Sequence, residues 1–427
     1  MRKLVALLFS APARSLRRNF WWSFLGYMIY GVTQWVIIVL IARMCNPSAV
    51  GQFALGLALS APINFLFNFN LRSMQATDAK GEYRFSEYMA LRAITTVLAF
   101  ATTMLACSLL GYSRETFLVV TLVAAAKGIE SLTDISHGLF QKIERMDIVC
   151  ISVSTKGIAS VAGMYLGLYF SGNLMVGLAA MILTWLLVAI GYDFPRSISL
   201  SAGGAVRNRG ATSVRWRMLR RLAFVAFPLG ISGFLWSLQS SIPRLFIERH
   251  LTMEEVGIFS ALAYILMVGA RFVLALNYAI NSRLSQHFAN GAMKSFVNLI
   301  LKVLGIDLCI GLAIVTASFV LGEHLLRLIY GTVYAEHSDT FVVLMAAGIP
   351  MYITASLEHT ATALRLIGVQ VQILLTGLAT ITAMCMILIP RFGITGAAWA
   401  MLIASLVQVV WYSAAIASKV KPLVDNS

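Results

Sequence analysis

Long apolar stretches constrain this chain more than any other feature. A helix needs about 20 mainly apolar residues to cross the hydrocarbon core of a bilayer. Twelve such stretches can be marked along the 427 residues: 20–42, 49–71, 88–111, 116–140, 148–170, 174–192, 222–243, 256–280, 296–320, 340–360, 369–389 and 394–418. Uniform apolar runs favour helices over the short alternating strands of a membrane barrel. The sequence therefore predicts an all-α membrane protein with twelve transmembrane helices.

The composition supports this class. With 59% hydrophobic and only 12% charged residues, the chain lacks the polar residues that cover a soluble globular domain. The net charge of +15 alone would suggest nucleic acid as a partner, but its position argues against that. If the N-terminus is inside, 22 of the 33 Lys and Arg fall in cytoplasmic segments. We therefore expect a multi-pass protein with both termini in the cytoplasm and no nucleic-acid partner.

A basic segment divides the chain. Between Arg196 and Arg221 it carries seven Arg and no acidic residue, which is typical of a topology signal and also suits contact with anionic lipid. The predicted parts are a cytoplasmic tail (1–19), a six-helix bundle (20–192), a basic cytoplasmic linker (193–221), a second six-helix bundle (222–418) and a cytoplasmic tail (419–427).

The two predicted bundles share a short repeat. Four identical pairs are separated by the same 206 positions: Arg43 and Arg249, Val50 and Val256, Gly51 and Gly257, Phe53 and Phe259. Six spans per half give both halves the same orientation, so a pseudo-two-fold axis along the membrane normal is expected. Transporters built on this plan bind substrate between the halves and alternate access by rocking them.

Several segments carry a family resemblance: Val50–Leu55, Glu130–Asp147, Leu325–Tyr334 and Ile389–Ala400. In this order they resemble the polysaccharide transporter family of the multidrug/oligosaccharidyl-lipid/polysaccharide exporter superfamily. The resemblance implies a flippase that moves an undecaprenyl-pyrophosphate-linked oligosaccharide, such as an O-antigen, capsule or exopolysaccharide unit. The implied direction is from the cytoplasmic to the outer face of a bacterial inner membrane. Implied partners are this lipid, membrane lipids and other polysaccharide-assembly proteins, and a monomer is the simplest expectation.

Ionisable residues inside a span are costly and mark candidate functional sites. The densest set lies in the stretch 116–140 and its end, at spacings of three, four, three and four: Lys127, Glu130, Asp134, His137 and Gln141. This spacing places all five on one helix face. Two interpretations stay open, namely a self-neutralising structural network and a part in substrate or ion handling, with coupling to a Na+ or H+ gradient.

Other buried charges are mostly positive. Lys127, Lys156 and Arg271 come from both halves and, if they converge, form a cationic cavity for a pyrophosphate headgroup. Snorkelling of Lys156 towards an interface is the alternative. Arg72 and Asn68 lie at the predicted cytoplasmic entrance, where Arg72 also fits a plain positive-inside residue. Asp307 shares a span with Lys302 and is a candidate for ion coupling or pairing.

Two rival functions remain. An ion-coupled multidrug exporter of the same superfamily would need surplus carboxylates in its cavity to bind cationic drugs, whereas the surplus here is cationic. A membrane enzyme of polysaccharide assembly would need chemistry in a long outer loop, and no outer loop exceeds about twenty residues. The six His residues show no metal-ligand spacing, so neither a metal nor a cofactor is predicted.

Overall fold

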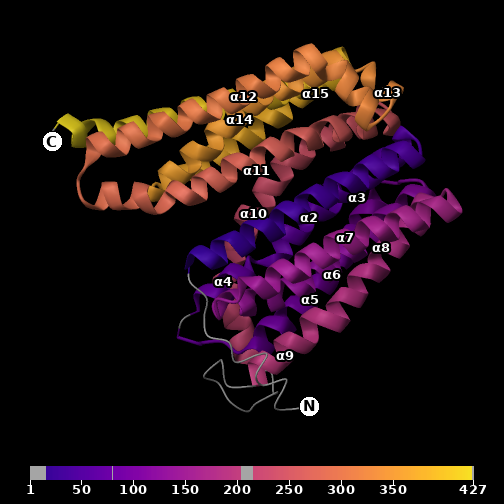
Figure 1. Ribbon diagram of the computed structural model, residues 1–427, viewed down its shortest axis with the longest axis horizontal. Helices are drawn as coiled ribbons and strands as arrows, with labels where there is room; N and C mark the ends of the chain where they lie inside the picture. The colour runs from indigo at the N-terminus through magenta and orange to yellow at the C-terminus, as the bar shows by residue number, and fades with distance from the viewer. Residues whose placement is uncertain (1–15, 79, 203–214, 426–427) are drawn as a thin grey trace. The chain divides into compact units, whose positions relative to one another are not determined.

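The computed structural model describes residues 16–78, 80–202 and 215–425, and every regular element in these ranges is helical (Figure 1). The α-helices are α2 (Leu16–Met44), α3 (Pro47–Asn68), α4 (Leu71–Thr77), α5 (Phe85–Leu109), α6 (Arg114–Lys142), α7 (Met146–Ser171), α8 (Leu174–Val188), α9 (Phe194–Ala202), α10 (Trp216–His250), α11 (Met253–Ala289), α12 (Met293–Ile329), α13 (Thr332–Ala335), α14 (Ser338–Ala363) and α15 (Ile367–Asp425). A π-helix, η1 (Ala189–Asp193), joins α8 to α9. The all-α prediction is confirmed. Most of the predicted N-terminal tail, and the linker from 203 to 214, lie outside the described residues.

Eleven described helices are long and apolar enough to cross a membrane. The last candidate, Gly368–Val420, has 53 residues, far more than one crossing needs. Gly393 (φ 58°, ψ −141°) divides α15 into two helices, and it lies between the predicted spans 369–389 and 394–418. The count of twelve crossings stays a prediction.

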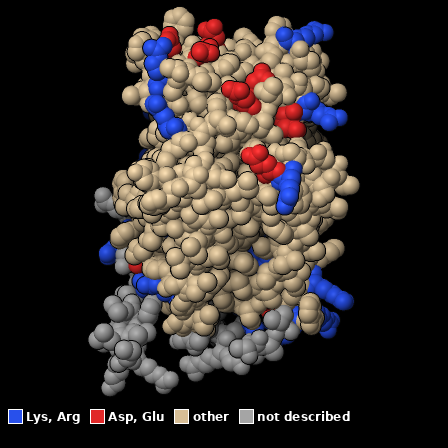
Figure 2. All heavy atoms as spheres, turned by 90° about the vertical axis from the view of Figure 1, so that its right-hand side faces the viewer, with Lys and Arg blue, Asp and Glu red and all other residues tan. Residues whose placement is uncertain are grey.

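The surface has the character expected in lipid. Large apolar side chains are strongly exposed, among them Phe170, Phe224 and Phe319 at 80%, 84% and 78%. Figure 2 shows that uncharged side chains dominate the visible face. A soluble protein rarely exposes so much contiguous apolar surface.

The helices group into two compact units. Unit 1 contains the chain up to Leu40 together with Leu59–Ser237, and unit 2 contains Ile41–Ala58 and the chain from Leu238 onward. Three helices, α2, α3 and α10, are therefore divided between the units. The predicted bundles, split at the linker 193–221, differ from these units in that respect.

The start of α10 shows why. Leu219, Leu222 and Ala226 are buried in one apolar cluster with Tyr88 and Leu91 of α5. Just before α10, Arg215 Nε donates to Glu87 Oε1 over 2.6 Å, and this hydrogen bond raises the pKa of the Arg215 guanidinium above its ordinary value. Arg215, which the sequence assigned to the linker, is thus paired with unit 1, whereas Arg217, Arg220 and Arg221 are exposed.

Unit 2 contains a reciprocal contact between the repeated glycines. A Cβ added to Gly51 of α3 would overlap the backbone oxygen of Met253, and one added to Gly257 of α11 would overlap that of Pro47. Pro47 and Met253 are also 206 positions apart. Each glycine therefore contacts the residue that lies four positions before the other glycine. A local two-fold axis produces this kind of reciprocal contact. The symmetry of the whole chain stays a prediction.

Candidate functional site

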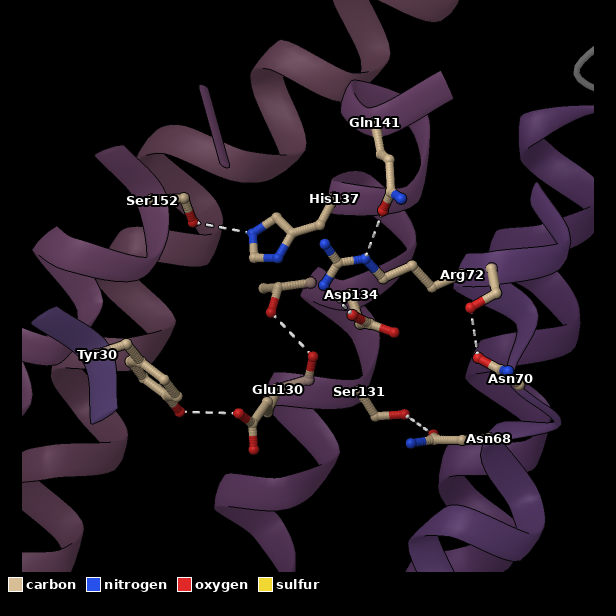
Figure 3. A network of polar contacts seen from close by, with 12 residues as sticks. Tyr30, Asn68, Asn70, Arg72, Glu130, Ser131, Asp134, His137, Gln141 and Ser152 are labelled. Carbon is tan, nitrogen blue, oxygen red and sulfur yellow. Dashed lines mark hydrogen bonds and ion pairs between the residues drawn. The ribbon is translucent and has the colours of Figure 1, made fainter. Parts of the chain in front are cut away.

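The charged stripe of α6 is the centre of a polar network in unit 1. Figure 3 shows Glu130, Ser131, Asp134, His137 and Gln141 on α6 with partners from four surrounding helices. These partners are Tyr30 of α2, Asn68 of α3, Arg72 of α4 and Ser152 of α7. In a membrane-spanning helix, such a face is stable only against other polar groups or water.

Asp134 lies between two guanidinium groups. Arg72 Nη1 donates to Asp134 Oδ1 at 3.0 Å, and Arg92 Nη2 lies 3.9 Å from Asp134 Oδ2. The Arg92 side chain, from α5, is fully buried, and its Nη1 donates to Asn68 and Ser131. The sequence did not predict Arg92 as a site residue. Its pairing depends on how α5 packs on α6, which the sequence does not show.

Glu130 forms a second cluster in the same network. Lys127 Nζ donates to Glu130 Oε2 and the Tyr30 hydroxyl donates to Glu130 Oε1, both at 2.8 Å. The two charged side chains are 28% and 29% exposed, so the interior of unit 1 does not enclose the pair completely. The Lys127–Glu130 pairing is the one the spacing suggested.

Lys156 of α7 is buried, at 2% exposure. Its Nζ lies 5.5 Å from the ring centroid of Tyr30 and 5.2 Å from that of Trp185 in α8. Both distances suit cation–π attraction. In unit 1, Lys156 therefore does not snorkel but lies between two aromatic rings, one of which also bonds Glu130.

His137 brings in a residue that sequence reasoning missed. Its Nε2 lies 3.0 Å from Ser152 Oγ and 3.5 Å from Asp193 Oδ1. Asp193 is fully buried at the end of η1. A π-turn inserts an extra residue and is frequent at functional sites. Hydropathy placed Asp193 at the start of the linker, because helical periodicity gives no sign of a π-turn.

The predicted entrance residues belong to this network as well. Asn68 accepts a hydrogen bond from Ser131 at 2.6 Å, and the Arg72 guanidinium lies 5.8 Å from the Tyr27 ring centroid. Arg72 Nε also donates to Gln141 at 3.3 Å. Asn68 and Arg72 thus hold α3 and α4 to α6, in addition to any role as an entrance.

The remaining predicted residues lie in unit 2. Arg271, on α11, has an exposed side chain, whereas Asp307, on α12, is fully buried. Convergence of Lys127, Lys156 and Arg271 on one cavity therefore stays a prediction. Within the described residues no group of three or more His, Cys, Asp and Glu could hold a metal ion.

The charges in the unit 1 network nearly balance. The cations are Arg72, Arg92, Lys127 and Lys156, and the carboxylates are Glu130, Asp134 and Asp193. With His137 neutral, one positive charge remains. Such a network can hold an anionic group by exchanging a carboxylate for a phosphate oxygen, without a bare positive cavity.

An Asp134→Asn variant tests the structural part of this network. Asp134 is 30% exposed, but the Arg92 side chain that it faces is fully buried, so removing the carboxylate leaves a buried guanidinium uncompensated, and we expect a loss of about 3 kcal/mol in folding free energy. Arg72 would also lose its ion pair with Asp134. The measurement is thermal unfolding of the purified protein in detergent, with the exposed Asp339 changed to Asn as the control. Equal melting temperatures for the two variants would contradict the proposed ion pair.

Comparison with known proteins identifies the family. The polysaccharide biosynthesis protein family matches residues 16–280, more than half of the chain. The chain belongs to this family. This polysaccharide biosynthesis protein is 25% identical over 406 residues to the capsular polysaccharide biosynthesis protein CapF of Staphylococcus aureus, covering 92% of this chain and 98% of CapF.

Solved structures show the fold. The polysaccharide biosynthesis protein resembles the lipid II flippase MurJ in an inward closed conformation, with a TM-score of 0.75, 11% identity, and coverage of 93% of this chain and 88% of MurJ. An inward-facing multidrug resistance MATE family transporter gives a TM-score of 0.65, 14% identity and 96% coverage of both chains. The predicted family resemblance is confirmed, since the chain belongs to the polysaccharide biosynthesis protein family and shares its fold with a lipid flippase and a MATE transporter. This fold and the eleven candidate spans support a multi-pass membrane protein.

Proposed function

We propose that this protein flips an undecaprenyl-pyrophosphate-linked oligosaccharide, the repeat unit of an O-antigen, capsule or exopolysaccharide, from the cytoplasmic to the outer face of a bacterial inner membrane. The observation that carries the proposal is the family match over 16–280, together with the fold likeness to MurJ. CapF is named for capsular polysaccharide and MurJ for flipping a lipid, which favours a lipid-linked glycan. Both termini would be cytoplasmic, and a monomer suffices.

In this proposal Lys127, Lys156 and Arg271 bind the pyrophosphate headgroup, and Arg72 and Asn68 receive it at the entrance. Lys127 is partly exposed and bonded to Glu130, so a phosphate oxygen can replace the Glu130 carboxylate as its partner. Because Arg presents a planar fork of donors, Arg271 would hold phosphate oxygens bidentately. Alternating access would bring the two units' cations to the headgroup in turn.

Ion coupling is assigned to the acidic and imidazole groups of the same proposal, namely Glu130, Asp134, His137 and Asp307. Glu130 displaced from Lys127 would become an unpaired carboxylate, which favours uptake of a proton or a cation. Substrate binding and ion binding would thereby be linked through one side chain. A Na+ or H+ gradient would drive transport in this scheme.

Multidrug export is the second candidate, because the fold also resembles a MATE transporter over 96% of the chain. A pump for lipophilic cations needs carboxylates that lack a basic partner. In unit 1, Glu130 and Asp134 are already paired with Lys127 and with Arg72 and Arg92. This pairing favours the anionic lipid-linked substrate.

Reconstitution tests the proposal. Proteoliposomes would contain the purified protein and a fluorescent undecaprenyl-pyrophosphate oligosaccharide, and a membrane-impermeant quencher would report the fraction in the outer leaflet. We expect the protein to speed exchange between leaflets at least tenfold over protein-free vesicles. The measurement is made both with and without a Na+ or H+ gradient. An exchange rate no faster than in protein-free vesicles under either condition would contradict the proposed function.

A further inference from the structure

A buried polar cluster in unit 2 lies outside the α6 network. It joins three helices: Ser356 of α14 donates from its Oγ to Asp307 Oδ2 of α12 at 2.5 Å, and Asn277 Nδ2 of α11 donates to Ser356 Oγ at 3.0 Å. Asp307 and Asn277 are 0% exposed and Ser356 is 3% exposed. Side chains of three helices thus form a hydrogen-bonded chain, from Asn277 through Ser356, that ends at the Asp307 carboxyl group inside unit 2.

The packing around the cluster is close. Gly311, one turn after Asp307, lies against α14, where an added Cβ would be 2.7 Å from Ile349 Cγ1. This small residue lets α12 approach α14, as glycine does in membrane helices. The close approach allows the short Ser356 side chain to reach Asp307.

The cluster is short of donors. Asp307 Oδ1 and Asn277 Oδ1 are both buried, and neither accepts a hydrogen bond from the described residues. In that part of the chain, no Lys, Arg or His nitrogen forms an ion pair with Asp307. A buried carboxylate without a cation costs several kcal/mol, so such a group takes a proton or a counter-ion.

Titratable groups on the surrounding helices do not supply that charge. They include Arg271 and Arg283 of α11, Lys302 of α12, Glu358 and His359 of α14, and Tyr412 of α15, whereas the Tyr352 hydroxyl of α14 donates to the Leu266 backbone oxygen. The Arg271, Arg283, Lys302 and Glu358 side chains are exposed, and none of the six groups pairs with Asp307 among the described residues. The Lys302 side chain is exposed on α12, whereas Asp307 is buried, and no ion pair joins these two residues.

We propose that Asp307 is a proton-binding site, with the proton held on Oδ1. One proton removes the uncompensated charge and turns an unpartnered acceptor into the donor that the cluster lacks. A metal cation such as Na+ would compete for the same unpartnered oxygens, Asp307 Oδ1 and Asn277 Oδ1, and the experiment below distinguishes the two. Loss of the proton would leave a bare charge between α11, α12 and α14, which favours their rearrangement. A role in driving transport rests on the proposed function; proton binding itself does not.

Infrared difference spectroscopy on the full-length protein in detergent tests this site without any transport substrate. At neutral pH we expect a protonated-carboxyl band that is lost in Asp307→Asn and kept in the exposed control Asp339→Asn. Ser356→Ala should keep the band but shift it to higher frequency, because one hydrogen bond to the carboxyl is gone; this variant also serves if Asp307→Asn does not fold. An unchanged band in Asp307→Asn, or a band lost on replacing choline chloride by NaCl, would overturn the proposal.

Discussion

Gly257→Ala should leave little folded protein. The added methyl group would overlap the backbone oxygen of Pro47, and it would lie 2.8 Å from the backbone nitrogen of Gly51. Backbone atoms cannot move aside as a flexible side chain can, so α3 and α11 must separate along their contact. Overpacking of this kind costs at least about 2 kcal/mol. The measurement is the yield of monodisperse protein in detergent and its melting temperature.

Gly305→Ala is the matched control, in α12. A Cβ at Gly305 meets nothing within 4 Å, so this variant should keep its stability or gain up to about 1 kcal/mol from better helix propensity. Gly51→Ala should resemble Gly257→Ala, because the contact is reciprocal. Normal yield and melting temperature for Gly257→Ala would show that α3 and α11 do not cross as closely as described.

Arg271→Ala should abolish transport of the lipid-linked oligosaccharide while leaving protein levels intact. Arg271 is exposed in unit 2, and in the described residues it forms no ion pair, so little stability depends on it. A hydrogen bond to a charged group contributes about 1.5–3 kcal/mol, and a bidentate phosphate contact includes two. We therefore expect the initial rate of leaflet exchange in proteoliposomes to fall by about a hundredfold or more.

Two further variants test whether transport depends on the positive charge alone, on the guanidinium group, or on its place at position 271. Arg271→Lys keeps the charge but loses the planar fork, so it should retain partial activity. Arg391→Ala removes another exposed Arg of unit 2, in α15, and should transport normally. Full transport by Arg271→Ala would remove this residue from the proposed site.

Hydropathy predicted the helical class because a helix that crosses a membrane needs an apolar stretch of about 20 residues, which is visible in the sequence. It marked the apolar part of each helix and not the helix end: α12 runs over Met293–Ile329, whereas the predicted span is 296–320. Helices continue past the bilayer where polar residues take over, and hydropathy falls at that point. The break between the last two predicted spans matches Gly393, which has a left-handed φ of 58°.

The site was only partly predictable. Spacing along α6 placed Lys127 beside Glu130, because residues three apart share a helix face. The partners of Asp134 and His137 come from α4, α5, α7 and η1, so they depend on tertiary packing. Arg92 and Asp193 were missed for this reason. The sequence repeat identified Gly51 and Gly257 as equivalent positions, but the close contact at these glycines is visible only in the structure.

The most direct test of the proposed function compares two substrates in the same proteoliposomes. We predict rapid, protein-dependent exchange of the fluorescent undecaprenyl-pyrophosphate oligosaccharide between leaflets. A lipophilic fluorescent cation should cross no faster than in protein-free vesicles, because the carboxylates of unit 1 are already paired. Transport of the cation without exchange of the lipid-linked oligosaccharide would contradict the flippase proposal and establish multidrug export in its place.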